Sequence, residues 1–295
     1  MSAIKKVISI NNEYETFYKE LTSRNYHFVP ASVQEKLKNF KILIAGCGST
    51  GGACTQSLAR LGVCNFYLAD NGDYELSNLN RQHARLENLN QNKAEFHANE
   101  IKRINPYVNI KFTNKGITKE NVDDYVRNVD LVFDAVDVTT KDGIEAKILL
   151  HKKCSEYKKP VLTGLDLGFL QWGRSYDYRN KDIKFLDGKA DFALKANHPI
   201  ASLFRIFPFQ IVPTHCYQLV LDLLENKISF ASQMGCTSDA LSAIIVPAVL
   251  NFAESQHLIT GWKLDLYKYR YSLKDQFKYW IKNRILKSKI NKFLK

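Results

Sequence analysis

The feature that most constrains the fold is a glycine-rich segment that directly follows a short apolar run. Residues 42–45 are Ile-Leu-Ile-Ala, and Gly46, Gly48 and Gly51 follow with the spacing GxGxxG. Such an apolar run is typical of a buried strand, and glycines there permit a tight turn and a close approach of the backbone to a ligand. The pattern therefore predicts a strand, a turn and a helix whose first amide groups face a phosphate.

Strand and helix patterns alternate through the first half of the chain. We predict strands at 41–45, 65–69, 107–112, 131–135 and 160–164, and helices at 52–61, 90–105, 121–128 and 141–157. This alternation favours an α/β fold with a Rossmann-like, doubly wound, mostly parallel sheet flanked by helices. After residue 164 the pattern changes, and we expect residues 165–178 to extend the sheet with antiparallel strands. Apolar helices are predicted at 216–224 and 238–254, with a strand around 263–269.

Three parts of the chain are expected to differ in role. Residues 1–38 form an N-terminal helical arm, and residues 39–260 form the nucleotide-binding domain with an irregular crossover insertion at 179–213. Residues 261–295 form a basic tail packed on the same domain. Between residues 262 and 295 there are nine Lys and two Arg against two Asp, so this part carries +9 of the total charge of +12. The rest is close to neutral, so the charge does not indicate nucleic-acid binding by the whole body.

The basic tail is predicted to contain an amphipathic helix, because Phe277, Ile281 and Ile285 recur at a spacing of four. Such a charged helix is most often laid on the protein body with its lysines in water. An acidic partner, a nucleic acid or an anionic membrane surface are alternatives that charge alone does not decide.

Cysteine usage and hydropathy limit the class of protein. The six cysteines are scattered, without a CxxC pair or a His/Cys cluster at zinc spacing. Neither a disulfide framework nor a structural zinc is therefore expected. No apolar run approaches the length of a membrane-spanning helix, and residues 1–6 lack the core of a signal peptide. We expect a cytoplasmic protein without a transmembrane segment.

Two cations downstream of the glycine turn indicate a triphosphate ligand. Asp70 ends the second predicted strand, where a carboxylate commonly accepts a hydrogen bond from a ribose hydroxyl. Arg81, close to Asn78, carries a planar guanidinium that can donate two hydrogen bonds to phosphate oxygens. Lys93 lies near the start of a predicted helix, where an ammonium and helix amides can bind a phosphate together. Each residue alone is typical of a turn or a surface. Together, after a phosphate-binding turn, they predict a triphosphate site.

Two acids close the predicted strand at 131–135. Ligands of open α/β sheets bind beyond the carboxyl ends of the strands, where Asp134 and Asp137 are placed. Asp137 is the candidate ligand for Mg²⁺, because this ion takes few protein ligands and several phosphate oxygens. Asp134 is expected to be structural.

The combination of these motifs resembles the ThiF/MoeB-type adenylyltransferases, the bacterial relatives of ubiquitin-activating enzymes. It consists of GxGxxG, Asp70, the string Ser-Asn-Leu-Asn-Arg-Gln at 77–82, Lys93 and Asp137. The resemblance runs from about residue 28 to about residue 253 and is tightest between residues 42 and 137. It implies ATP and Mg²⁺ as cofactors, and a homodimer across which Arg24 reaches the ATP of the partner subunit. The implied nucleotide-binding residues are Gly46, Gly48, Ser49, Gly51, Asp70, Ser77, Asn78, Asn80, Arg81 and Lys93, with Asp137 holding Mg²⁺.

Several departures from the family pattern leave the acyl substrate open. Many members bind zinc through two CxxC pairs, which this chain lacks, and residues 230–232 hold no cysteine where thioester-forming members carry one. Val138 stands where Asn is common, and an insertion at 195–213 replaces the usual crossover segment. Cys216 is expected to be a small buried residue rather than a nucleophile.

The resemblance implies ATP-dependent activation of a carboxylate, as an acyl-adenylate with release of pyrophosphate. The carboxylate would be the C-terminus of a ubiquitin-like or sulfur-carrier protein or of a peptide. With a pKa of roughly 3.5 it is already ionised at pH 7, so positioning and cations suffice without a general base. A tRNA-nucleoside carboxyl-activating dehydratase of the same family is an alternative.

Two readings from outside the family stay open. An NAD-dependent oxidoreductase would also use the glycine turn and Asp70, but it leaves Arg81 and Lys93 without a role. A nucleotide-binding subunit without activity would not need those two cations or Asp137.

Overall fold

A seven-stranded sheet in the order β3-β2-β1-β4-β5-β6-β7 forms the centre of the protein. The computed structural model describes residues 13–269 and 272–294, with the backbone alone at 273 and 276–282. Strands β1 to β5 run parallel, whereas β6 pairs antiparallel with both β5 and β7. The predicted doubly wound sheet with an antiparallel extension is therefore confirmed. The strands are β1 Lys41–Ala45, β2 Asn65–Ala69, β3 Asn109–Thr113, β4 Leu131–Asp134, β5 Pro160–Leu167, β6 Leu170–Asp177 and β7 Gly261–Asp265.

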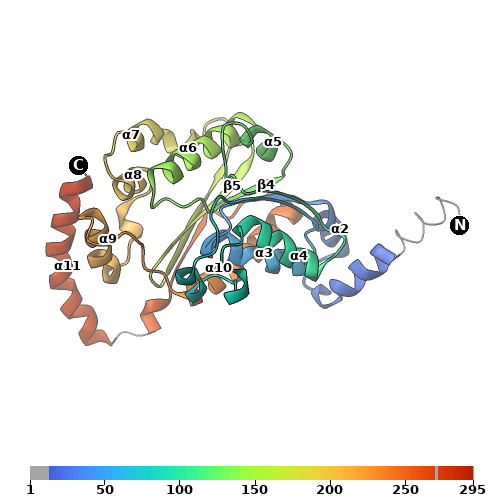
Figure 1. Cartoon of the computed structure of the whole chain (residues 1–295), viewed down its shortest axis with the longest axis horizontal. Coiled ribbons are helices and arrows are strands. Elements are labelled where there is room, and N and C mark those ends of the chain that lie inside the picture. The colour runs from blue at the N-terminus through green and yellow to red at the C-terminus, as the bar shows by residue number, and fades with distance from the viewer. Residues whose placement is uncertain (1–12, 270–271, 295) are drawn as a thin grey trace, which may run out of the picture.

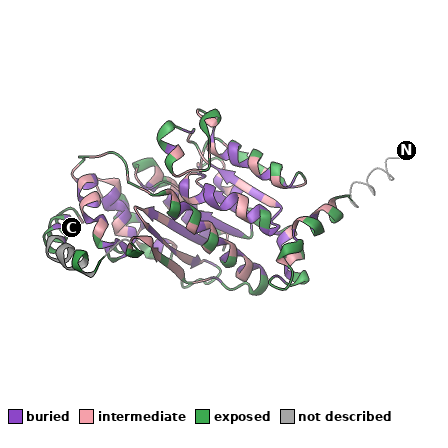
Figure 2. Cartoon of the chain, turned by 90° about the horizontal axis from the view of Figure 1, so that it is seen from below, coloured by how far each residue is buried: buried purple, intermediate pink, exposed green. Residues whose placement is uncertain are grey.

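Helices cover both faces of the sheet (Figure 1). One face carries α2 Ala31–Asn39, α3 Ser49–Leu61, α4 Lys93–Ile104 and α10 Gly235–Ser255, and the other carries α5 Val122–Arg127, α6 Lys141–Glu156, α7 Ala190–Leu194 and α8 Pro199–Ile206. Successive side chains of a strand point to opposite faces. Ile42 and Ile44 of β1 accordingly pack in one hydrophobic core, and Leu43 and Ala45 pack in the other. Figure 2 shows the buried strands between helices whose outer faces are exposed.

The remaining elements connect this framework. Residues 13–21 are helical, α9 spans Tyr217–Leu224 and α11 spans Leu273–Leu294. Short 3-10 helices are η1 Ser23–Asn25, η2 Leu76–Asn80, η3 Leu86–Asn88, η4 Phe185–Gly188, η5 Phe209–Ile211, η6 Thr214–Cys216 and η7 Leu266–Tyr269.

The prediction of an irregular segment at 179–213 is wrong. This segment contains α7 and α8, and α8 begins at Pro199, where the fixed backbone angle of proline suits the first helical position. The ring Nδ1 of His198 accepts a hydrogen bond from the Ile200 amide at 3.1 Å and caps this helix. The buried residues of α8, among them Ile200 and Ile206, join the core. Helices this short give too little periodicity to be detected in the sequence.

Helix α10 corrects the expectation about long apolar runs. It begins at Gly235 rather than at 238, and by length and composition alone it could cross a membrane, with a mean hydropathy of 1.5 over 18 residues. Its buried residues include Leu241, Ile245 and Phe252, and the helix packs against α3 and α2. Its apolar composition is therefore accounted for by its position in the core.

The tail helix α11 packs against α8 and α9 with a different face from the predicted one (Figure 1). Leu286 and Ile290 are buried, whereas Ile285 is exposed, so the expected apolar stripe is wrong at that position. Phe277 and Ile281 of the same stripe lie outside the described side chains, and residues 1–12 of the predicted arm lie outside the described chain.

A buried polar cluster joins β4, β5 and α6. Asp134 and Lys147 form an ion pair in which neither side chain is exposed. Oδ2 of Asp134 also accepts a hydrogen bond from the Thr163 hydroxyl at 2.8 Å and lies 2.9 Å from Nε2 of His151. Burial by itself would raise the pKa of Asp134, but the Lys147 ammonium and His151 hold it well below its usual range. The expectation that Asp134 is structural is confirmed.

Replacement of Lys147 by Met should lower the free energy of unfolding by about 3–5 kcal/mol, because the buried carboxylate of Asp134 loses its counter-charge. Denaturant-induced unfolding at pH 7 measures this change. The double variant Lys147→Met with Asp134→Asn removes both charges and should recover most of the loss. A decrease below about 1 kcal/mol in the single variant would contradict the importance of this pair.

Candidate functional site

A cavity of about 830 Å³ lies at the carboxyl ends of β1, β2 and β4, beside β5. Gly51, Asn80 and Arg24 do not line this cavity, and Arg24 is an exposed residue of η1. The predicted site residues that do line it are Gly46, Gly48, Ser49, Asp70, Ser77, Asn78, Arg81, Lys93 and Asp137. The fold thus brings together side chains from five separate segments of the chain.

The backbone of the glycine turn packs closely against the backbone at the end of β4. Gly46 has a φ of +89°, and a Cβ there would lie 2.2 Å from the carbonyl oxygen of Ala135. Its amide donates a hydrogen bond of 2.8 Å to the carbonyl of Ala69, at the end of β2. A Cβ at Gly51 would lie 1.9 Å from the carbonyl oxygen of Gly46. Gly51 therefore lets α3 pack on the turn and does not reach the cavity itself.

Asp70 lines the cavity and also stabilises the glycine turn through hydrogen bonds. Its Oδ2 accepts the amide of Cys47 at 2.5 Å, and its Oδ1 accepts the amide of Gly72 at 2.7 Å. Burial raises the pKa of Asp70, and these two amides together with the Lys93 ammonium oppose that rise. The carboxylate thereby links the end of β2 to the glycine turn.

Arg81 is oriented by a residue that is 152 positions away in the sequence. Its Nε donates a hydrogen bond of 2.5 Å to Oε1 of Gln233, which also accepts a bond of 3.3 Å from the Ser49 hydroxyl. One further guanidinium nitrogen, Nη1, donates to the carbonyl of Ser77 at 3.0 Å and to Oδ1 of Asn80 at 2.9 Å. Asn80 therefore supports the orientation of Arg81 and does not face the cavity.

Lys93 is the first residue of α4, and it also lines the cavity. The helix start is capped by Asn92, whose side chain accepts the amides of Ala94 and Glu95. The ammonium of Lys93 lies 5.9 Å from the ring centroid of Tyr74, which is fully buried, so the ring attracts this cation.

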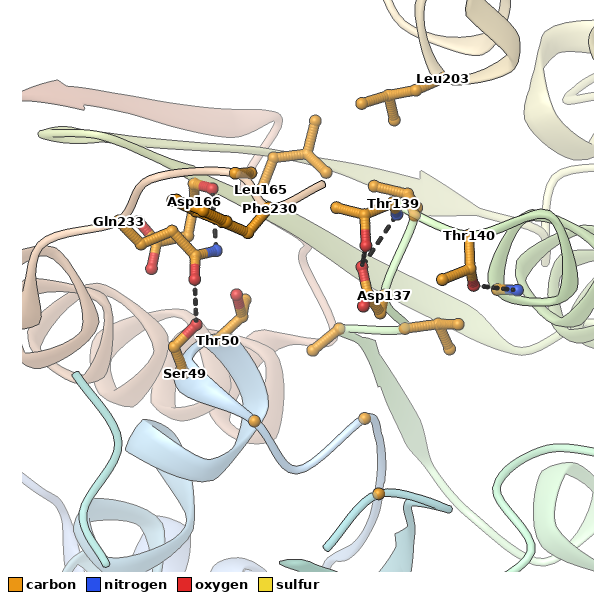
Figure 3. Close-up of a pocket in the computed structure, with 18 of the residues that line it drawn as sticks. Ser49, Thr50, Asp137, Thr139, Thr140, Leu165, Asp166, Leu203, Phe230 and Gln233 are labelled. Atoms are coloured by element: carbon orange, nitrogen blue, oxygen red, sulfur yellow. Dashed lines mark hydrogen bonds between the residues drawn. The ribbon is translucent and has the colours of Figure 1, made fainter. Parts of the chain in front are cut away.

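Asp137 lies in the loop between β4 and α6. Its Oδ1 accepts hydrogen bonds from the amide of Thr139 at 2.9 Å and from the hydroxyl of the same residue at 2.8 Å (Figure 3). Among the described residues, no three His, Cys, Asp or Glu side chains gather in a group that could hold a metal ion. Mg²⁺ takes most of its ligands from phosphates and water, so a single protein carboxylate suits it where a ligand supplies phosphates.

Asp166 and Gln233 are cavity residues that the sequence did not reveal. Asp166 lies in β5 and accepts a hydrogen bond from the Thr237 hydroxyl at 2.8 Å, while Nε2 of Gln233 donates to its backbone carbonyl at 3.1 Å (Figure 3). Burial raises the pKa of Asp166 to about 6, against the opposing effects of Thr237 and Arg81. No spacing links β5 to the residues before α10, so only the packing of α10 on the sheet brings them together.

Cys216 is 3% exposed and packs in the core, and burial raises the pKa of its thiol to about 12. The expectation that it is a small buried residue is therefore confirmed. A thiol with this pKa is almost entirely protonated at neutral pH, and it is a poor nucleophile because the thiolate is the reactive form.

The pKa of Asp166 predicts a specific pH dependence of stability. Its folded pKa of about 6 lies above the unfolded value of 3.8, so the ionised carboxylate destabilises the fold above pH 6. This destabilisation decreases as the pH falls from 6 towards 4, because the folded protein then holds the carboxyl group in its neutral form. The difference in unfolding free energy between Asp166→Asn and the wild type should therefore shift by about 2 kcal/mol, in favour of the wild type, between pH 7.5 and 4.

Thermal and denaturant unfolding across this pH range measure the shift. Asp191→Asn, which alters an exposed acid of α7, is the matched control. A pH-independent difference for Asp166→Asn would mean that Asp166 is not the titrating group.

A family profile described as "ThiF family" matches residues 22–176. The molybdopterin-synthase adenylyltransferase of Haemophilus influenzae is 36% identical over 132 residues, which cover 44% of this chain and 52% of that protein. The tRNA threonylcarbamoyladenosine dehydratase of Bacillus subtilis is 31% identical over 145 residues, which cover 48% of this chain and 55% of that protein. The chain thus spans about half the length of these curated relatives.

A solved structure shares the fold over a longer stretch. The E. coli tRNA N6-threonylcarbamoyladenosine dehydratase superimposes with a TM-score of 0.57 and 20% identity, covering 81% of this chain and 95% of that one. The fold therefore extends beyond the segment that the family profile matches.

Proposed function

Because this chain belongs to the ThiF family, we propose that it is an ATP-dependent adenylyltransferase that activates a carboxylate as an acyl-adenylate. The observation that carries the proposal is that Arg81, Lys93 and Asp137 line the same cavity as the glycine turn. A nicotinamide-binding site has no need for two cations at this position. The carboxylate is that of a small carrier protein or a peptide.

The phosphates would lie along the glycine turn and the first turn of α3, where amides of Gly48 and Ser49 and the helix dipole favour negative charge. Arg81, already oriented by Gln233, and Lys93 would neutralise the phosphate oxygens. Asp70 would accept a hydrogen bond from the ribose in addition to those from the turn. Ser77 and Asn78 would complete the polar wall.

Asp137 is the residue that would hold Mg²⁺ in this site. Both of its hydrogen bonds among the described residues are accepted by Oδ1, so Oδ2 is available as a ligand atom. The bound ion would supply positive charge to the phosphate oxygens.

The chemistry requires positioning rather than proton transfer. An oxygen of the substrate carboxylate attacks the α-phosphorus of ATP and forms a new P–O bond. The bond from the α-phosphorus to the oxygen that bridges to the β-phosphate breaks, and pyrophosphate leaves with that oxygen. Because the attacking carboxylate is already ionised, the protein holds the reactants in line and stabilises charge through Arg81 and Lys93.

The proposal includes a homodimer in the cytoplasm, in which Arg24 serves the site of the partner subunit. Its support is that Arg24 is exposed and lies outside the cavity of its own chain. A tRNA-modifying dehydratase is the second candidate, favoured by the match to the Bacillus subtilis relative and by the basic tail. Exchange of pyrophosphate driven by tRNA, and not by peptides or carrier proteins, would favour this second candidate.

Replacement of Arg81 by Ala should lower the rate of ATP–pyrophosphate exchange by about 10²–10³-fold, because a preorganised cation at the phosphates is lost. Calorimetric titration with ATP and Mg²⁺ should show weaker binding in this variant, with the unfolding temperature almost unchanged. Arg60→Ala is the matched control, since Arg60 is an exposed residue of α3 outside the cavity. Near-normal exchange in Arg81→Ala, or binding of NAD⁺ in place of ATP, would contradict the proposed function.

A further inference from the structure

The cavity has two halves of different chemistry. The half near the glycine turn is polar and charged, whereas the half beyond β5 is walled by aliphatic and aromatic side chains. Among the described lining residues between 165 and 233, Asp166 is the one that can ionise. We call this second half the apolar chamber, and its principal lining residues are Leu165, Leu203, Phe204, Ile211, Val220 and Leu223.

The chamber is built by the segment that replaces the expected irregular insertion. Leu203 and Phe204 belong to α8, and Val220 and Leu223 belong to α9. In Figure 3, Leu203 faces the space between Leu165 and Thr139. Helix α11 supports these walls from behind, because it packs on α8 and α9. The chamber is therefore part of the folded core and is present before any ligand binds.

Asp166 follows Leu165 in β5, and its side chain points to the opposite face of the sheet, towards α10. The Thr237 hydroxyl binds its Oδ1 at 2.8 Å, and the Ser238 hydroxyl lies 3.5 Å from Oδ2. Its backbone carbonyl holds Gln233, which in turn orients Arg81. Thr237 and Ser238 supply donors to this buried carboxylate, and the backbone of Asp166 connects the wall of the chamber to the residues around Arg81.

We infer that the activated carboxylate belongs to a peptide chain whose C-terminal residue has a large apolar side chain. This inference rests on the proposed function. The carboxylate would face the phosphates, and the side chain would fill the apolar chamber. A terminal Gly leaves the chamber empty, and a terminal Asp would place an unpaired charge among aliphatic residues.

A panel of short peptides that differ in the last residue tests this inference. N-acetyl-Gly-Leu, N-acetyl-Gly-Phe, N-acetyl-Gly-Ala, N-acetyl-Gly-Gly and N-acetyl-Gly-Asp are compared as substrates in ATP–pyrophosphate exchange with the full chain. We expect kcat/KM to be at least about a hundredfold higher for the Leu peptide than for the Ala peptide, because three carbon atoms are lost from the chamber. The Gly and Asp peptides should be weaker still.

Variants of the chamber should change this preference and not only the overall rate. Leu203→Phe fills the space and should lower kcat/KM for the Leu peptide by about tenfold, with little change for the Ala peptide. Leu194→Ala is the control, because Leu194 is an exposed apolar residue of α7 outside the cavity.

The outcomes separate this inference from the proposed function. Equal or better exchange with the Gly or Asp peptide would overturn the inference while leaving the adenylyltransferase intact. ATP binding without binding of any peptide to the ATP-bound protein, measured by calorimetry, would also overturn it. A protein that does not bind ATP at all would instead contradict the proposed function.

Discussion

The close contact between the glycine turn and the end of β4 is the constraint on which the rest of the site depends. At Gly46 the backbone approaches the carbonyl of Ala135 so closely that no side chain could be accommodated. Because β1 lies between β2 and β4 in the sheet, this contact places Asp70 on one side of the turn and Asp137 on the other. The positions of the acidic residues follow from the order of the parallel strands.

Buried polar contacts fix this edge of the sheet in place. The ion pair of Asp134 and Lys147 ties β4 to α6, so the loop that carries Asp137 is anchored at both ends. On the other side, Gln233 connects Arg81 and Ser49 to the backbone of β5. The network of Asp134 is fully buried, where hydrogen bonds hold a geometry firmly but are costly to leave incomplete, and the network of Gln233 is partly buried. The network of Gln233 fixes the orientation of the Arg81 guanidinium.

The two halves of the cavity are built by different parts of the chain. The polar half comes from the parallel βα units, whose carboxyl ends bind ligands in many open sheets. The apolar chamber comes from β5 and from α8 and α9, which follow the antiparallel extension of the sheet. A different set of helices at 179–224 would therefore change the apolar chamber and leave the polar half intact.

The sequence by itself determined the parallel sheet, the glycine turn and the residues that surround it, because these depend on local periodicity and short spacings. The cavity residues that the sequence revealed lie within 92 residues of one another, in the segments that follow strands of the parallel sheet. They are Gly46, Asp70, Arg81, Lys93 and Asp137. The tertiary structure alone decided the positions of Gln233 and Asp166 and the formation of the apolar chamber. These depend on the packing of α8, α9 and α10 on the sheet, and contacts between segments so far apart leave no periodic signal in the sequence.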